Sequence, residues 1–87
     1  MLKGTTSAGF EFEISDETLD NFEIVEQLLK LEDGDNMAFW RVGYLLFGED
    51  GMRALREACA DEDGNVKTSV MREQLNEVLT NQKPVKN

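Results

Sequence analysis

The tripeptide Glu-Asp-Gly occurs three times in this chain and limits the length of any one helix. The copies begin at Glu32, Glu49 and Glu62, so they are offset by 17 and then by 13 residues. The sequences between them do not align, which argues against an internal repeat. Glycine accepts the left-handed conformation that often ends a helix, and a nearby acid favours the start of the next one. We therefore interpret the three copies as helix terminators.

Between these terminators, apolar residues recur at helical spacing. The pattern predicts helices over residues 16–31, 37–47 and 51–61, and a fourth that follows a cap at residues 68–69 and ends at residue 80. Helix-capping side chains precede three of them, at residues 15–16, 35–36 and 68–69. The first helix carries two adjacent apolar stripes, so we expect it to bury a wide face. These stripes are Leu19, Phe22, Val25 and Leu29, and Ile24, Leu28 and Leu31. The second helix is apolar on nearly every side, which is typical of a central helix.

An N-terminal β-hairpin, or at least a strand, is predicted before the helices. Residues 10–14 alternate apolar and polar side chains, and a Ser-Ala-Gly turn separates them from residues 2–6. An isolated hairpin is marginal in water, so it must pack on the helices or pair with another chain. The expected fold is mainly α: a small four-helix domain with this hairpin, over residues 1–80. A flexible polar tail is expected over residues 81–87.

Length and composition favour one soluble domain. A chain of 87 residues, 40% of them apolar, has enough apolar side chains for a single core. Cys59 is the only cysteine, which excludes an internal disulfide and suits a reducing cytosol. No run approaches the roughly 18–20 apolar residues of a membrane span. We therefore expect a soluble protein with no membrane segment.

The net charge of -9 is concentrated near the N-terminus. Residues 11–36 hold ten acidic side chains and one basic side chain, Lys30. Nucleic-acid binding depends on Lys and Arg neutralising phosphates, so this balance argues against nucleic-acid and anionic membrane partners. Three interpretations stay open: a solvated helix face, a docking surface for a basic partner, and a mimic of nucleic acid.

The acidic segment ADEDGNV, residues 60–66, has the composition of a calcium loop but not its spacing. An EF-hand loop needs a glycine at position 6 and a glutamate at position 12. Counted from Asp61, these positions hold Val66 and Arg72. The register that places the glycine correctly starts at a cysteine and ends at Val70. We therefore interpret the segment as a turn, with weak calcium binding as the alternative.

Catalytic and cofactor motifs are sparse. The chain has no histidine and one cysteine, so it offers no Cys-His or Ser-His pair and no standard zinc set, and we find no phosphate-binding glycine loop. We expect a non-enzymatic protein without a cofactor. Binding then depends on apolar side chains that one small core does not readily conceal or that a strand edge exposes. The candidate partner-binding residues are Phe10, Phe12, Phe39, Trp40, Tyr44 and Phe47.

The order of short segments resembles a known family. GTTSAGFEFEI is followed by an acidic helix ending in LEDGD, then LLFGEDGMRALREA, DEDGNV and MREQLNEVL. This order, over about residues 4–80, is similar to that of the small tail assembly chaperones of long-tailed phages and prophages of Gram-positive bacteria. The resemblance implies binding to the tape measure protein, recruitment of major tail tube protein subunits, and release before the tail is complete.

The resemblance also implies a place and a form of action. Such a protein acts in the bacterial host cytoplasm and is not expected in the mature virion, and a longer frameshifted form and a homo-oligomer are both open. The alternative hypothesis is an acidic phage-encoded inhibitor that mimics nucleic acid and binds a host DNA-binding protein. A DNA-binding regulator would need a basic helix, and acids surround the one close basic pair, Arg53 and Arg56.

Overall fold

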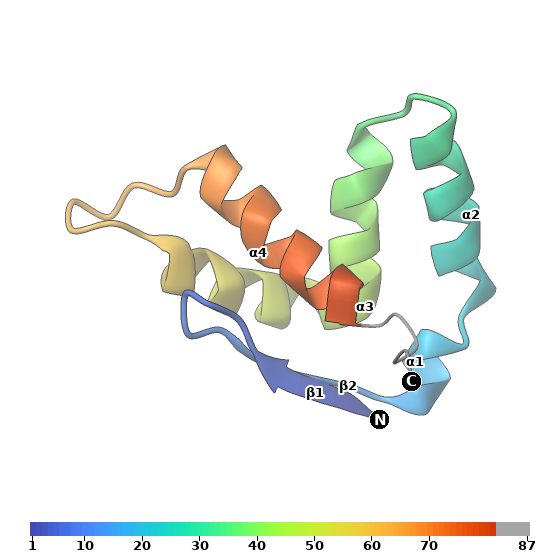
Figure 1. The fold of residues 1–87 in the computed structure, drawn as a ribbon, viewed down its shortest axis with the longest axis horizontal. Helices are drawn as coiled ribbons and strands as arrows, with labels where there is room; N and C mark the ends of the chain where they lie inside the picture. The colour runs from blue at the N-terminus through green and yellow to red at the C-terminus, as the bar shows by residue number, and fades with distance from the viewer. Residues whose placement is uncertain (82–87) are drawn as a thin grey trace.

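The computed structural model describes residues 1–81, which form four helices and a two-stranded antiparallel sheet (Figure 1). The elements are β1 Leu2–Thr5, β2 Glu11–Ile14, α1 Asp16–Leu19, α2 Phe22–Glu32, α3 Met37–Cys59 and α4 Thr68–Asn81. The predicted mainly α domain with an N-terminal hairpin is confirmed. The predicted flexible tail, residues 81–87, lies outside the described residues apart from Asn81, which ends α4.

The helices form two groups. Figure 1 shows α2 standing beside the first half of α3 at one edge of the molecule. At the middle of α3 the chain turns, and α4 lies across its second half while the hairpin runs along the opposite side. Within residues 1–81, no helix is both long enough and apolar enough to cross a membrane.

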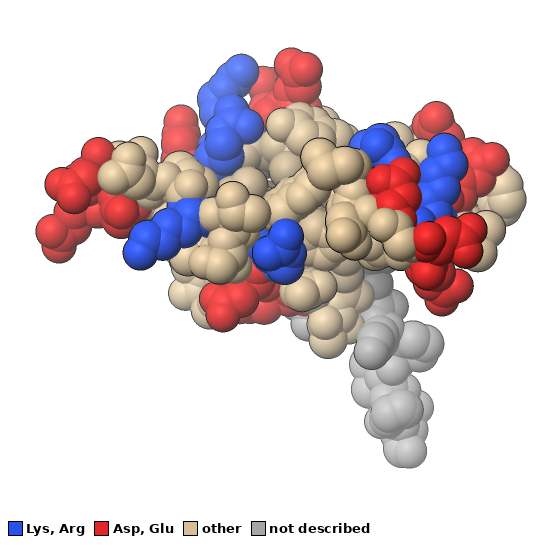
Figure 2. All heavy atoms as spheres, turned by 90° about the horizontal axis from the view of Figure 1, so that it is seen from above, with Lys and Arg blue, Asp and Glu red and all other residues tan. Residues whose placement is uncertain are grey.

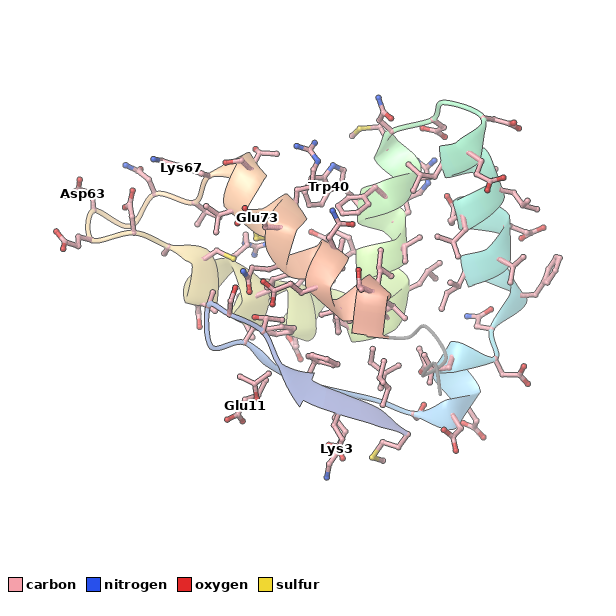
Figure 3. The ribbon with its side chains drawn as sticks, viewed as in Figure 1. Lys3, Glu11, Trp40, Asp63, Lys67 and Glu73 are labelled. Carbon is pink, nitrogen blue, oxygen red and sulfur yellow. The ribbon has the colours of Figure 1, made fainter. Side chains whose placement is uncertain are left out.

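The hairpin packs on the helices as expected. β1 pairs with β2 in antiparallel register, with Leu2 opposite Ile14 and Thr5 opposite Glu11. Alternation sends Phe12 and Ile14 inward, where both are buried. Figure 3 shows Lys3 and Glu11 pointing away from the helices. The sheet therefore has one face in the core and one polar outer face.

The predicted helix over residues 16–31 is wrong in one respect, because it breaks into α1 and α2. The Ser15 hydroxyl accepts from the Thr18 amide at 3.1 Å, which confirms the predicted N-cap. Six residues after Ser15, Asn21 has an extended backbone and its side chain accepts from the Glu23 amide at 2.9 Å. An Asn side chain offers the backbone this alternative to a continuous helix. Asn21 therefore caps a second helix inside the predicted one.

The three Glu-Asp-Gly copies act differently. The first ends α2 as predicted, with Asp33 as the C-cap and Gly34 at a φ of 101°. The second copy does not end a helix, because α3 continues through Glu49, Asp50 and Gly51. The break is a kink at Gly48, whose φ of 72° lies outside the helical region, and helical structure resumes at once. The third copy lies beyond the end of α3, in the turn that contains Gly64.

The core lies between the hairpin, α3 and α4. α3 is the central helix, as predicted, and the fully or nearly fully buried residues along it are Ala38, Phe39, Val42, Gly43, Leu46, Met52, Leu55 and Cys59. α4 contributes Met71, Leu75 and Val78, all buried. A side chain at Gly43 would meet Met52 Sδ at 3.1 Å and Leu75 Cδ2 at 3.2 Å. The absence of a side chain there lets the two halves of α3 and α4 approach closely.

Candidate protein-binding surface

The six aromatic residues that the sequence analysis proposed for partner binding are buried to different degrees. Three of them, Phe10, Phe12 and Phe39, are buried in the core rather than at the surface. The Phe10 ring meets the Phe47 ring edge-on, with centroids 5.2 Å apart. The Phe10 and Phe47 rings join the hairpin to α3; Phe47 is partly buried, whereas the three buried rings are closed to a partner.

The other candidates are more accessible. Trp40 is partly buried, with the Arg72 guanidinium carbon 5.6 Å from its ring centroid. Tyr44 is exposed, with 45% of its surface accessible. It lines a shallow groove between α2 and α3 with Glu23, Gln27, Arg41 and Leu45. Tyr44 is therefore the one sequence-predicted candidate that the structure places fully at the surface.

The largest set of exposed apolar side chains lies on α2, where the sequence did not predict a site. The exposed fractions are 65% for Phe22, 45% for Val25, 39% for Leu28 and 55% for Leu29. Residues three, four and seven positions apart share one side of a helix. We call these four residues the α2 stripe.

Within the described residues, α2 packs mainly against α3 on its inner side, and the α2 stripe on its outer side is exposed. Ile24 is the one residue of α2 that is buried, while Gln27 and Leu31 are partly covered on the same side. Successive helical residues are rotated by about 100°, so Phe22, Val25 and Leu29 point away from that side. The expected wide buried face of this helix is therefore wrong. The presence of two apolar stripes was the signal in the sequence, because one neighbouring helix cannot cover both.

Arg41 fixes the groove side of the α2–α3 pair. Its guanidinium donates to Gln27 Oε1 at 2.6 Å and to Asp35 Oδ2 at 2.5 Å. Asp35 Oδ1 in turn accepts from the Met37 amide at 3.1 Å, at the start of α3. These contacts tie α2, the connecting turn and α3 together. The α2 stripe is thus presented on a fixed helix pair.

The charge around the α2 stripe is acidic. Residues 16–36 carry eight acidic side chains and Lys30, a net charge of -7. On one face of the molecule, Figure 2 shows acidic side chains gathered toward both ends, with basic and uncharged residues between them. The α2 stripe therefore lies in a segment of net negative charge, and Figure 2 also shows basic side chains among the acidic ones.

In the acidic turn after α3, the Asp61 side chain is hydrogen-bonded to backbone amides of the same turn. The Asp61 carboxylate accepts from the amides of Asp63 and Asn65, both at 2.9 Å. Figure 3 shows Asp63 at the outer tip of this turn. In the part of the chain that the structure places, no three His, Cys, Asp or Glu side chains gather as a metal site would require.

A second polar cluster joins the hairpin turn to α4. The Glu77 carboxylate accepts from the Ser7 hydroxyl at 2.5 Å and from the Ser7 amide at 2.8 Å. Buried Gln74 donates to the Ser7 hydroxyl at 2.9 Å and accepts from the Ala8 amide at 3.1 Å. The hydrogen bonds from Ser7 lower the pKa of Glu77. The cluster has a structural role, because all of its groups bond to one another.

The lone cysteine belongs to the core. Cys59 is buried at the end of α3, and burial raises the pKa of its thiol. A raised pKa reduces the thiolate fraction, and the thiolate is the reactive form. Cys59 therefore behaves as a small apolar side chain.

The chain matches no family model, and no curated protein or solved structure shows a significant match to it.

Proposed function

We propose that this protein is a phage tail assembly chaperone, which binds the tape measure protein and helps to recruit tail tube subunits without catalysis. The α2 stripe carries the proposal. It exposes four apolar side chains on a helix that is held in place by α3. Exposed apolar clusters of this kind often mark protein-binding sites. The order of segments that resembles this family supplies the proposed partners.

The proposed mechanism is reversible burial of apolar surface. A long helical partner exposes apolar side chains before it is assembled, and docking them on the α2 stripe removes both surfaces from water. The net charge of -9 would oppose aggregation of the complex. Several copies could bind along one long partner, because it would offer many adjacent segments. Binding of many copies to one chain would keep more of its apolar surface covered. Release would follow when tube subunits replace the chaperone, in the host cytoplasm.

The acidic residues of α1 and α2 favour a second candidate, an inhibitor that mimics nucleic acid. A mimic would present its carboxylates as a continuous ridge, and its binding would weaken steeply with salt. On the face shown in Figure 2, basic and uncharged side chains interrupt the acidic ones. Binding that persists at high salt would support the chaperone, because apolar contacts are not screened.

Co-expression tests the proposed function. Fragments of the tape measure protein encoded beside this chain's gene are expressed alone, with the wild type and with Leu29→Ser, and soluble fragment is measured. We expect the wild type to increase the soluble fraction and Leu29→Ser to reduce that increase. Met37→Ser is the matched control, because Met37 is 60% exposed but lies outside the α2 stripe. If no fragment gains solubility with the wild type, the proposed function is wrong.

A further inference from the structure

The acidic flanks of the α2 stripe restrict what can cover it. Glu26 lies four residues after Phe22 and three before Leu29, along one edge of the stripe, and Glu32 follows Leu29 by three residues at the end of α2. Both are exposed. A partner that buries Phe22 and Leu29 must therefore approach the carboxylates of Glu26 and Glu32. Opposite charges across an interface favour association, whereas like charges facing each other cost several kcal/mol.

A second copy of this chain is a poor fit for the stripe. Residues 16–36 carry eight acidic side chains and one basic side chain, so two copies meeting here would bring together two regions of net charge -7. Lys30 is the one base on α2 that could pair across such an interface. The charge balance therefore favours a basic partner over self-association.

The spacing of the stripe indicates the shape of that partner. Phe22, Val25 and Leu29 follow the three-then-four spacing that lets two helices pack along a shared seam. From Phe22 to Leu29 the stripe runs seven residues, about 10 Å or two helical turns. Leu28 widens it on one side. An amphipathic helix of two or more turns has matching length and spacing.

We infer that the α2 stripe binds an amphipathic helix that carries Lys or Arg beside its apolar seam. The apolar seam would bury against Phe22, Val25 and Leu29, and the bases would lie opposite Glu26 and Glu32. This inference rests on the proposed function and specifies which segments of a long partner the chaperone would select. Segments with acidic flanks would be rejected by repulsion at the same carboxylates.

Two synthetic peptides with the same leucine spacing and opposite charge test the charge requirement. The probe is a fluorescent 18-residue helix of Leu and Lys with leucines at three-then-four spacing, and its matched peptide has Glu in place of Lys. Binding to the full chain is measured by fluorescence anisotropy. We expect the Leu/Lys peptide to bind at least about tenfold more tightly than the Leu/Glu peptide, which corresponds to about 1.4 kcal/mol.

Variants show whether the α2 stripe is the site. Phe22→Ser and Leu29→Ser leave the net charge unchanged and should each weaken Leu/Lys peptide binding at least about tenfold, because each removes a large apolar side chain from the interface. Met37→Ser should bind within about twofold of the wild type. Circular dichroism melts of each variant confirm that it is folded. If the Ser variants bind like the wild type, attraction is by charge alone and the inference is wrong.

Two further outcomes separate the inference from the proposed function. A wild-type dimer in analytical ultracentrifugation that dissociates in Leu29→Ser would show that a second copy occupies the stripe, and would overturn the inference. Rescue of tape measure fragments that survives both Ser variants would also overturn it, while leaving the proposed function standing. Peptide binding at the stripe without rescue of any fragment would overturn the proposed function and support the helix-binding site.

Discussion

Helices α2 and α3 are both apolar over much of their surface, yet they are buried to very different degrees. α3 buries eight residues, whereas α2 buries Ile24 alone. Both have amphipathic patterns, and the difference comes from their neighbours. The hairpin and α4 cover α3, while α2 has α3 on its inner side and stands at the edge of the molecule (Figure 1). An apolar helix face thus shows where contact is favourable, and its neighbours decide whether that contact is made within the chain.

The largest expected effect on the free energy of unfolding is at the buried contact between α3 and α4. Leu75 on α4 is 0% exposed and contacts the α3 side at Gly43. Leu75→Ala should lower the free energy of unfolding by about 2–5 kcal/mol, because it removes buried methyl groups and leaves a cavity. Urea denaturation followed by circular dichroism measures this change. A loss below about 1 kcal/mol would show that the α3–α4 contact is not a packed core.

Substitution at the kink in α3 should lower the free energy of unfolding almost as much. Gly48 has a φ of 72°, which a residue with a side chain adopts with strain. Gly48→Ala should therefore lower the free energy of unfolding by about 1–3 kcal/mol. Asn76→Ala, at an exposed position of α4, is the control and should change it by less than about 0.5 kcal/mol. Equal stability of Gly48→Ala and the wild type would mean that the kink is not required.

A smaller, pH-dependent effect is expected where the hairpin turn meets α4. Hydrogen bonds from the Ser7 hydroxyl and amide lower the pKa of Glu77 in the folded protein. The corresponding stabilisation is present above the pKa of the unfolded chain's glutamate and is lost as the pH falls through the lowered value. Thermal melts from pH 7 to pH 3 should show a shallower acid-dependent loss for Glu77→Gln than for the wild type. Parallel curves would show that this carboxylate is not coupled to folding.

The smallest effect on stability is expected at the α2 stripe. Leu29 is 55% exposed, so Leu29→Ala should change the free energy of unfolding by less than about 0.5 kcal/mol. The same urea titration used for Leu75→Ala compares the two leucines directly. If Leu29→Ala costs as much as Leu75→Ala, the stripe is covered in solution and the contrast between α2 and α3 does not hold.

Local signals in the sequence predicted most of the elements but placed some boundaries wrongly. Alternation over residues 10–14 and the cap at Ser15 were sufficient for the hairpin and the start of α1. Asn21 was missed because an Asn inside an apolar pattern is compatible with both a helix interior and a cap. The break near Gly48 was predicted in the right region, but its form depends on the packing of both halves of α3 around Gly43.

The candidate site was less predictable than the fold. Phe10, Phe12 and Phe39 were candidate contact residues, but all three are buried. The Phe10 and Phe12 rings pack against Phe47 where the hairpin meets α3, and the Phe39 ring packs against Trp40. The α2 stripe was present in the sequence as a second apolar pattern beside Ile24, and it was interpreted as part of a wide buried face. Aromatic content alone did not identify exposure, since it carries no information about which elements are neighbours.

The sequence by itself determined the helices, the hairpin and the acidic character of residues 11–36, because these follow from side-chain type and spacing along the chain. Only the tertiary structure decided that the apolar surface of α3 is closed and that of α2 is open. Periodicity fixes the direction in which a side chain points from its own helix. Whether another element is there to meet it depends on contacts between residues far apart in the chain, and those contacts leave Phe22, Val25, Leu28 and Leu29 exposed.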